Sequence, residues 1–180
     1  VIQHVDRLDF DYVPEELPHR DDQLRLLAQL FKQTLKGVSQ NAVITGPVGS
    51  GKTAIAKKLC QELTKVARKK GRMLDYVHVN CRKRSTESMV LLAVLNHFDP
   101  RFPDRGFSVQ EMLEVLKRQL IRKKTHLIIV LDEADALLKK SGSDLIYNLS
   151  RFSDESSKQQ MGVSLLLVSQ HDILRLLDDA

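Results

Sequence analysis

The residues from Gly46 to Thr53, GPVGSGKT, have the types and the spacing of a loop that binds phosphate groups. Three glycines let the backbone turn tightly and direct its N–H groups at phosphate oxygens. Lys52 supplies a cation for the β- and γ-phosphates of a nucleotide, and the hydroxyl of Thr53 is a ligand for magnesium. The residues expected to contact the nucleotide here are Gly46, Pro47, Val48, Gly49, Ser50, Gly51, Lys52, Thr53 and Ala54.

Two adjacent carboxylates, Asp132 and Glu133, follow an apolar run and form the second group suited to chemistry. A carboxylate at the end of a buried strand, beside a phosphate-binding loop, can hold magnesium. Glu133 is then placed to orient or deprotonate a water that attacks the terminal phosphate, so it is the candidate catalytic base. The alternative is an acidic strand end that faces solvent, and the phosphate-binding loop argues against it.

A third polar group, SQH at 169–171, ends another apolar run. Gln170 is the candidate for a contact with the γ-phosphate or with the attacking water, because this strand is expected to lie beside the two that carry the loop and the acids. The alternative is that Ser169 or His171 only caps the helix that follows. Both interpretations stay open on the sequence.

The elements that must position these groups follow from the pattern of apolar residues. Apolar runs predict strands, and a periodicity of 3.6 residues predicts helices between them. Strands that alternate with helices indicate an α/β fold, in which a parallel sheet is covered on both faces and binds ligands at the carboxyl ends of its strands. The strands are expected at 41–45, 75–80, 126–135 and 163–170, and the helices at 21–36, 52–69, 85–98, 109–120, 144–152 and 172–179.

The helix ends also carry signals. Asp21 or Asp22 is expected to cap the helix at 21–36, and Gly37 to end it. Ser108 and Glu111 fit a capping box at the start of the helix at 109–120. The buried face of the helix at 52–69 is expected to consist of Ile55, Leu59, Leu63 and Val66.

The composition is that of an ordinary globular protein, with 42% hydrophobic and 28% charged residues in 180. The only two cysteines, Cys60 and Cys81, are interpreted as free thiols, and a disulfide between them is the less favoured alternative. No apolar run approaches the ~18 residues that cross a membrane, and no signal peptide is visible. No membrane partner is therefore expected.

Positive charge is concentrated in the middle of the chain. Residues 61–125 carry 15 Lys and Arg against 7 Asp and Glu, whereas residues 126–180 carry 5 against 9. Such clusters are often solvated helix faces, but their concentration also fits a polyanionic partner. The basic segments are ARKKGR at 67–72, RKR at 82–84 and KRQLIRKK at 117–124.

In this order, GPVGSGKT, LIIVLDEAD and SQH resemble the core of an AAA+ ATPase, which is a P-loop NTPase with an αβα sandwich around a parallel sheet. Three further stretches resemble the archaeal initiator branch, related to the largest origin-recognition subunit and the cell-division-cycle helicase loader. They are YVPEELPHRDDQL at 12–24, VHVNC at 77–81 and PDRGFSVQEML at 103–113.

The resemblance implies ATP or ADP as the nucleotide, magnesium as the metal, and a hydrolysis of ATP that is slow in this chain. The absence of an N-K-x-D or T-K-x-D guanine signature agrees with adenine. A lead-in segment at 1–20 would lie against the adenine and precede a nucleotide-binding base at 21–180. Gln170 would stand at the family's first sensor, where Asn is usual. The residues that would bound the adenine pocket are Pro18, His19 and Arg20.

The family continues into a fifth strand, an arginine finger, a helical lid and a winged helix, so the chain is interpreted as truncated before the lid. Its implied partners are double-stranded origin DNA, the replicative helicase and sibling initiator subunits. Its implied location is the cytoplasm with the nucleoid, or the nucleus in a eukaryote. A helical insertion at about 85–120 would touch DNA, with Arg101 and Arg105 on phosphates, unless these arginines are only solvated.

Two other functions share the same loop and acids. The main alternative is a nucleotide-gated signalling or assembly module that does not bind DNA. A small-molecule kinase is less favoured, because the pair Asp132 and Glu133 indicates water as the phosphate acceptor.

Overall fold

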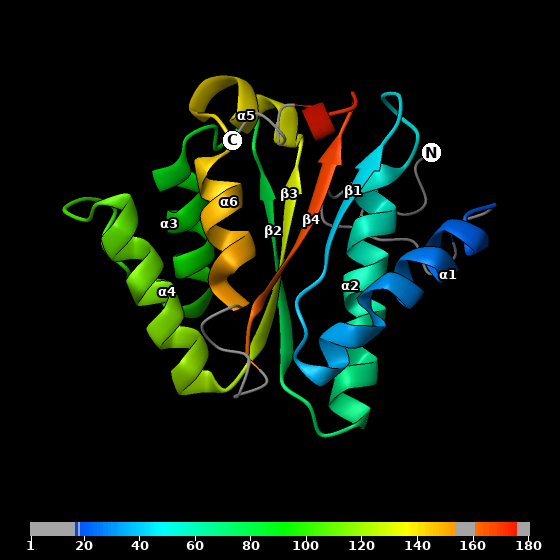
Figure 1. The fold of residues 1–180 in the computed structure, drawn as a ribbon, viewed down its shortest axis with the longest axis horizontal. Helices are drawn as coiled ribbons and strands as arrows, with labels where there is room; N and C mark the ends of the chain where they lie inside the picture. Colours follow the sequence, from blue (N-terminus) through cyan, green and yellow to red (C-terminus); the bar gives the residue numbers. More distant parts are fainter. Residues whose placement is uncertain (1–16, 18, 154–160, 176–180) are drawn as a thin grey trace, which may run out of the picture.

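A four-stranded parallel sheet forms the centre of the molecule, as the computed structural model in Figure 1 shows. The structure describes residues 17, 19–153 and 161–175. The strand order is β1-β4-β3-β2, so β4 lies between β1 and β3, and the predicted α/β fold class is confirmed. The strands are β1 Asn41–Thr45, β2 Leu74–Asn80, β3 His126–Asp132 and β4 Val163–Ser169.

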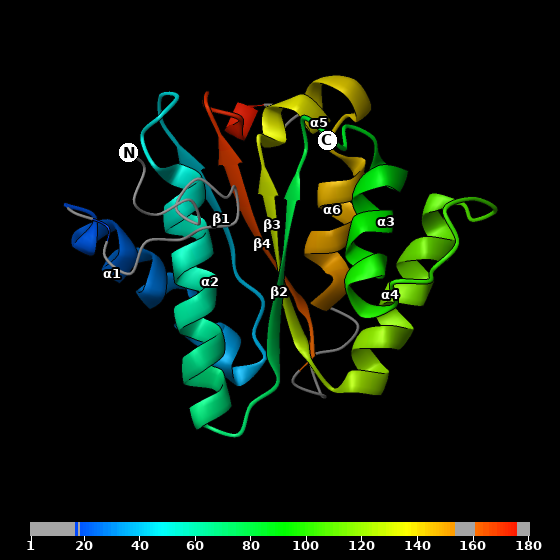
Figure 2. The same ribbon diagram turned by 180° about the vertical axis from the view of Figure 1, so that it is seen from behind.

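Helices cover both faces of this sheet (Figures 1 and 2). One face carries α1 and α2 with the 3₁₀ helix η2, and the other carries α3, α4 and α6. None of the helices in the described ranges combines the length and the apolar character needed to cross a membrane. The helical bounds are α1 Asp21–Leu30, η2 Phe31–Lys36, α2 Lys52–Lys69, α3 Glu87–Phe98, α4 Val109–Lys123, α5 Ala134–Ser141, α6 Asp144–Ser150 and η3 Arg151–Ser153.

The two central strands, β3 and β4, are buried along their whole length. Successive side chains of a strand point to opposite faces, so both sets need an apolar partner. Ile129 and Leu131 pack into the cluster under α3 and α4, whereas Ile128 and Val130 pack into the cluster under α2. The chemistry must therefore lie at the ends of the strands.

The predicted helix at 21–36 divides at Phe31 into α1 and the 3₁₀ helix η2. The hydroxyl of Thr34 donates a hydrogen bond of 2.6 Å to the carbonyl of Phe31, and such local bonds compete with regular helical ones. The predicted cap at Asp21 or Asp22 is wrong, because Arg20 occupies the cap position and no side chain caps the helix. Gly37, with a φ of 82°, ends η2 as predicted.

Helix α2 begins and ends as predicted, and its buried face is predicted correctly except at the last turn. Val66 is 37% exposed, and Ala67 is buried in its place. The buried stripe continues from Leu63 by four residues to Ala67, the same step that separates Ile55, Leu59 and Leu63. The free, buried thiols of Cys60 and Cys81 confirm that no disulfide forms.

The ends of the other elements show one error and one confirmed motif. The strand predicted to reach residue 135 stops at Asp132, because Glu133 turns the chain with a φ of 54° and α5 follows. The capping box of Ser108 and Glu111 is present at the start of α4, which continues three residues past its predicted end to Lys123. Half of the helix predicted at 172–179, residues 176–179, lies outside the described residues.

Candidate nucleotide-binding site

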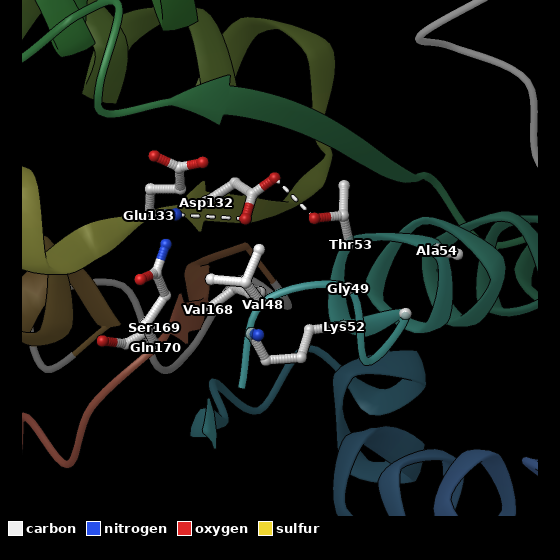
Figure 3. Close-up of a pocket in the computed structure, with 11 residues that line it drawn as sticks. Val48, Gly49, Lys52, Thr53, Ala54, Asp132, Glu133, Val168, Ser169 and Gln170 are labelled. Atoms are coloured by element: carbon white, nitrogen blue, oxygen red, sulfur yellow. Dashed lines mark hydrogen bonds between the residues drawn. The ribbon is translucent and has the colours of Figure 1, made fainter. Parts of the chain in front are cut away.

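A cleft of about 340 Å³ lies at the carboxyl ends of β3 and β4, next to the loop that follows β1 (Figure 3). The order β1-β4-β3 brings together three segments that are distant in the sequence. Open parallel sheets bind ligands at this edge. The cleft is lined by Val48, Gly49, Gly51, Lys52, Thr53, Ala54, Asp132, Glu133, Val168, Ser169 and Gln170.

The phosphate-binding loop turns through backbone conformations that favour glycine. Gly49 and Gly51 have φ values of 76° and 81°, in the left-handed region that side chains rarely adopt. Helix α2 begins immediately after Gly51, so its amino end borders the cleft. The positive end of the helix dipole therefore faces the position of an anion.

The ammonium group of Lys52 lies over this loop. Its Nζ donates hydrogen bonds of 2.7 Å to the carbonyls of Gly46 and Pro47. The carbonyls of Gly46 and Pro47 thus hold the ammonium group over the loop. Lys52 lines the cleft, whereas Gly46 and Pro47 do not. Ser50 plays a similar supporting role, because its hydroxyl lies 3.4 Å from the same ammonium.

Asp132 is held by three hydrogen bonds at the end of β3. Its Oδ2 accepts from the Thr53 hydroxyl at 2.8 Å and lies 3.1 Å from Nε2 of His78. Its Oδ1 accepts from the backbone N–H of Glu133 at 3.0 Å. Burial alone would raise the pKa of Asp132, but the bonds from His78 and Thr53 outweigh it and hold the pKa below its usual value. The carboxylate is therefore charged at neutral pH.

Glu133 stands at the sharp turn between β3 and α5. A non-glycine residue in the left-handed region is strained, and such strain clusters at functional sites. The carboxylate of Glu133 forms an ion pair with Nε of Arg82, 2.5 Å away in the segment after β2. Glu133 lies beside Asp132 at the cleft, and its carboxylate points away from Lys52 in Figure 3.

The end of β4 divides its polar groups between two tasks. The hydroxyl of Ser169 lies 3.4 Å from a carboxylate oxygen of Asp135 and accepts a 3.3 Å bond from the N–H of His171. Ser169 therefore orders the turn after the strand. Gln170 lines the cleft, and its amide points toward Glu133 in Figure 3. A contact of Gln170 with the γ-phosphate or the attacking water stays a prediction.

The lead-in residues occupy different surroundings. Arg20 donates a 2.8 Å hydrogen bond to the carbonyl of Ser50, so it contacts the outer side of the phosphate-binding loop. His19 is exposed and does not line the cleft. Pro18 lies outside the described residues.

Arg101 and Arg105 lie away from the cleft, in the connection between α3 and α4. This connection protrudes on the side of the molecule opposite α2 (Figure 1), and both arginines are exposed. Phe102 packs against the core, and the ring of Phe107 lies 5.0 Å from it between centroids. The two aromatic rings thus anchor the connection to the core, and its arginines face solvent.

Three residues at the site were not predicted from the sequence. His78 contacts Asp132, Arg82 contacts Glu133, and Val168 lines the cleft. The alternation of β2 places His78 and Asn80 on one face, which is a usable signal. The register that sets Asn80 opposite Asp132 is a tertiary feature that a single sequence does not reveal.

The donors around Asp132 fit magnesium. Among the residues that the structure describes, no three or more His, Cys, Asp or Glu side chains gather as a metal site. Magnesium does not require such a cage, because it keeps several waters and takes one or two carboxylates together with phosphate oxygens. The converging oxygens of Thr53 and Asp132 supply that kind of partial set.

Comparison with known proteins identifies the family. Residues 35–177 match the family model described as AAA domain. The chain is 35% identical to ORC1-type DNA replication protein 2 of Saccharolobus solfataricus, over 98% of this chain and 44% of that protein. The chain belongs to the AAA+ ATPases, in the branch of the ORC1-type replication initiators. The ORC1-type DNA replication protein of Thermococcus kodakarensis is 34% identical over 91% of this AAA+ chain and 40% of that protein.

Solved structures agree with this assignment. The Aeropyrum pernix ORC1 protein in complex with DNA matches with a TM-score of 0.80 and 35% identity, over 95% of this chain and 45% of that one. The Aeropyrum pernix ORC2 protein, in ADPNP-ADP complexes, matches with a TM-score of 0.83 and 25% identity, over 96% and 47%. This AAA+ chain spans less than half the length of these relatives, and it belongs to a family that binds nucleotides.

Proposed function

We propose that this chain is the ATP-binding and ATP-hydrolysing part of a DNA replication initiator, in which bound ATP acts as a conformational switch. The observation that carries the proposal is the convergence of Lys52, Thr53, Asp132, Glu133 and Gln170 on one cleft. These groups come from three strand ends and have the types that phosphate transfer to water requires.

Each group has a specific proposed role. The loop N–H groups and Lys52 bind the β- and γ-phosphates, and the electrostatic complementarity provides most of the affinity. Thr53 and Asp132 hold magnesium, which would neutralise charge on the phosphate oxygens when bound. Glu133 orients and deprotonates the attacking water, and Gln170 contacts the γ-phosphate or that water. Glu133 must exchange its ion pair with Arg82 for this water contact.

The adenine would bind beyond the loop, next to the lead-in. The hydrogen bond from Arg20 to Ser50 supports this placement, because it ties the lead-in to the phosphate-binding loop. Pro18 and His19 would complete the pocket. Exchange of ATP for ADP would then change the conformation of the loop and of the lead-in together. This coupling would carry the conformational switch away from the phosphates.

Origin DNA is the proposed polyanionic partner. The Aeropyrum pernix ORC1 protein, 35% identical to this chain, is described in complex with DNA. The connection at 99–108 presents Arg101 and Arg105 to solvent on a firm aromatic base, which suits contacts to phosphates. The proposal also includes three properties of the whole protein. They are loading of the replicative helicase, assembly with sibling initiator subunits and association with the nucleoid.

The nucleotide half of the proposal is tested with Lys52→Ala and Glu133→Gln in the whole protein. Lys52→Ala should weaken ATP binding by 30-fold or more, since losing a charged hydrogen-bond partner costs about 2–5 kcal/mol. Glu133→Gln should bind ATP normally and hydrolyse it at most at about 1% of the normal rate. Equal losses of ATP binding in the two variants would refute the assigned roles.

The DNA half is tested by fluorescence anisotropy with duplex DNA at several salt concentrations. The double variant Arg101→Ala with Arg105→Ala should lower the affinity. The slope of log affinity against log salt should become smaller by about two, as expected for two lost phosphate contacts. Unchanged affinity and salt dependence would exclude this connection as a DNA contact. A protein that binds no duplex at any salt concentration would instead support the signalling or assembly module.

A further inference from the structure

Two basic segments that are 50 residues apart in the sequence meet at the amino ends of the strands. The first includes Arg68, Lys69, Lys70 and Arg72, at the end of α2 and just beyond it. The second includes Arg122, Lys123 and Lys124, at the end of α4. All seven residues are exposed, and we refer to them as the amino-end basic cluster. The ends of both helices lie at the lower edge of the molecule in Figures 1 and 2.

One backbone hydrogen bond joins the chain just after the two segments. The backbone N–H of His126 donates a 3.0 Å hydrogen bond to the carbonyl of Met73. Two clefts flank this junction, with volumes of about 280 and 270 Å³. Arg68, Arg72 and Lys123 line one cleft, and Arg72 and Lys124 line the other. The cations therefore surround concave surfaces.

The charge of this cluster is poorly balanced. The two segments contain no Asp or Glu; Asp75 lines the first cleft, and no acid among the described residues lines the second. Asp75 is already engaged by Nε2 of His97 at 2.8 Å. Cations at the carboxyl end of a helix stabilise the helix dipole, which explains some of the basic residues. Arg72 lies beyond the end of α2.

The amino-end basic cluster is separate from the nucleotide site. The phosphate-binding loop and Asp132 lie at the opposite ends of the strands, and the seven residues of β3 separate the two edges by roughly 23 Å. The cluster therefore does not contribute to the binding of ATP phosphates.

We propose that the amino-end basic cluster binds the phosphate backbone of duplex DNA. This inference rests on the DNA-binding half of the proposed function and adds a second contact surface to it. Interfaces between proteins are depleted of lysine at their centres, whereas interfaces with DNA are strongly positive and polar, so the composition favours nucleic acid.

Helix α4 supplies the geometry for a single duplex. It starts just after the connection that carries Arg101 and Arg105, and it ends in the cluster. Its 15 residues span ~22 Å, which corresponds to roughly six or seven base pairs at 3.4 Å each. Arg118, between the two ends, is also exposed. A duplex that lies along α4 would contact both basic regions and would contact no base edges at the cluster.

The test compares two triple variants of the whole protein by anisotropy with a 30-base-pair duplex. The cluster variant carries Lys69→Gln, Lys70→Gln and Lys124→Gln. The control variant carries Arg25→Gln, Lys139→Gln and Lys140→Gln, which removes three exposed positive charges from α1 and α5. Thermal unfolding checks that both variants fold.

The cluster variant should bind the duplex at least tenfold more weakly than the control variant. The slope of log affinity against log salt should be smaller by about two to three, because each lost phosphate contact removes about 0.9. Lysine acetylation of the unsubstituted protein gives a second measurement that does not depend on a variant. Duplex DNA should protect Lys69, Lys70 and Lys124, and should leave Lys139 and Lys140 reactive.

Three outcomes would overturn the inference. If the cluster variant matches the control and the lysines stay reactive, while Arg101→Ala with Arg105→Ala weakens binding, the cluster has no DNA role and the proposed function stands. If the unsubstituted protein binds no duplex, both fail. If the cluster variant loses binding to a polyglutamate peptide but keeps its affinity for duplex, the partner is an acidic protein.

Discussion

The two ends of the sheet contain similar kinds of polar residues and use them differently. At the carboxyl end, Asp132 and Glu133 face a cleft and are available to a ligand. At the amino end, the side chains of His126 and Ser164 are buried and bonded to each other at 2.8 Å. The backbone N–H of Gln40 also donates to Ser164, at 2.9 Å. The carboxyl end presents its two acids to a cleft, whereas the buried pair at the amino end is bonded within the core.

The pKa values of the buried groups follow the same division. Hydrogen bonds hold the pKa of Asp132 below its usual value despite burial, so this group stays charged. Burial lowers the pKa of His126 to about 4, so this group stays neutral. A buried charge is costly unless it is compensated, and the fold keeps it only where a ligand can use it. Changes to the buried polar groups at the carboxyl end should therefore affect chemistry, and changes to the buried pair His126 and Ser164 at the amino end should affect stability.

Asp132→Asn should produce the largest effect, and the effect should be on hydrolysis. Without the carboxylate, magnesium is held poorly, and metal stabilisation of phosphate charge is worth several kcal/mol, so turnover should fall about 10³-fold. ATP binding measured in EDTA should change little. The melting temperature should shift by only a few degrees, because Asn preserves the shape. A large loss of stability with normal turnover would contradict the division between the two ends.

The nucleotide site illustrates what a single sequence can predict. The loop from Gly46 to Thr53 and the acids at 132–133 are local in sequence, and the strand–turn–helix context places them at one cleft. The contacts of His78 with Asp132 and of Arg82 with Glu133 depend on which strands pair and in which register. That information is distributed over the whole core, so local patterns did not contain it.

The fold itself was predictable in its elements and less so in their ends. Continuous apolar runs gave β3 and β4 because burial on both faces requires them. The break at Phe31 and the turn at Glu133 were missed, because each depends on a hydrogen bond or a strained backbone rather than on apolar periodicity. The proximity of residues 68–72 to residues 122–124 could not be predicted either. It follows from the placement of α2 and α4 on opposite faces of one sheet.

His126 should make stability depend on pH at the amino end. Its pKa is about 4 in the folded protein and about 6.5 when unfolded, so the unfolded state binds more protons between these values. Stability should therefore fall as the pH falls, by about 3 kcal/mol from pH 7 to pH 4. Urea unfolding at several pH values measures this. His126→Gln should remove most of that pH dependence, and an equally steep loss in this variant would assign the effect to other groups.

His78 should have an intermediate effect at the carboxyl end, because it contacts Asp132, the proposed magnesium ligand, at 3.1 Å. Loss of such an outer partner typically weakens metal binding by roughly 10–100-fold. His78→Phe should therefore raise the magnesium concentration needed for half-maximal hydrolysis by about tenfold, with kcat at saturating magnesium nearly normal. His78→Gln keeps a donor and should recover much of this loss. An equal defect in both variants would mean that His78 acts by packing alone.

Arg82→Gln should have the smallest effect on stability and still distinguish the two ends. The ion pair with Glu133 joins side chains that are 67% and 28% exposed, so solvent screening limits its contribution to less than about 1 kcal/mol. Its consequence for chemistry is different, because Glu133 must leave Arg82 to contact the attacking water. Turnover at saturating ATP should therefore rise a few-fold, with Lys83→Gln as a control for lost charge. A fall in turnover would instead place Arg82 among the groups that assist the reaction, and the carboxyl end would then contain one more working residue than its cleft shows.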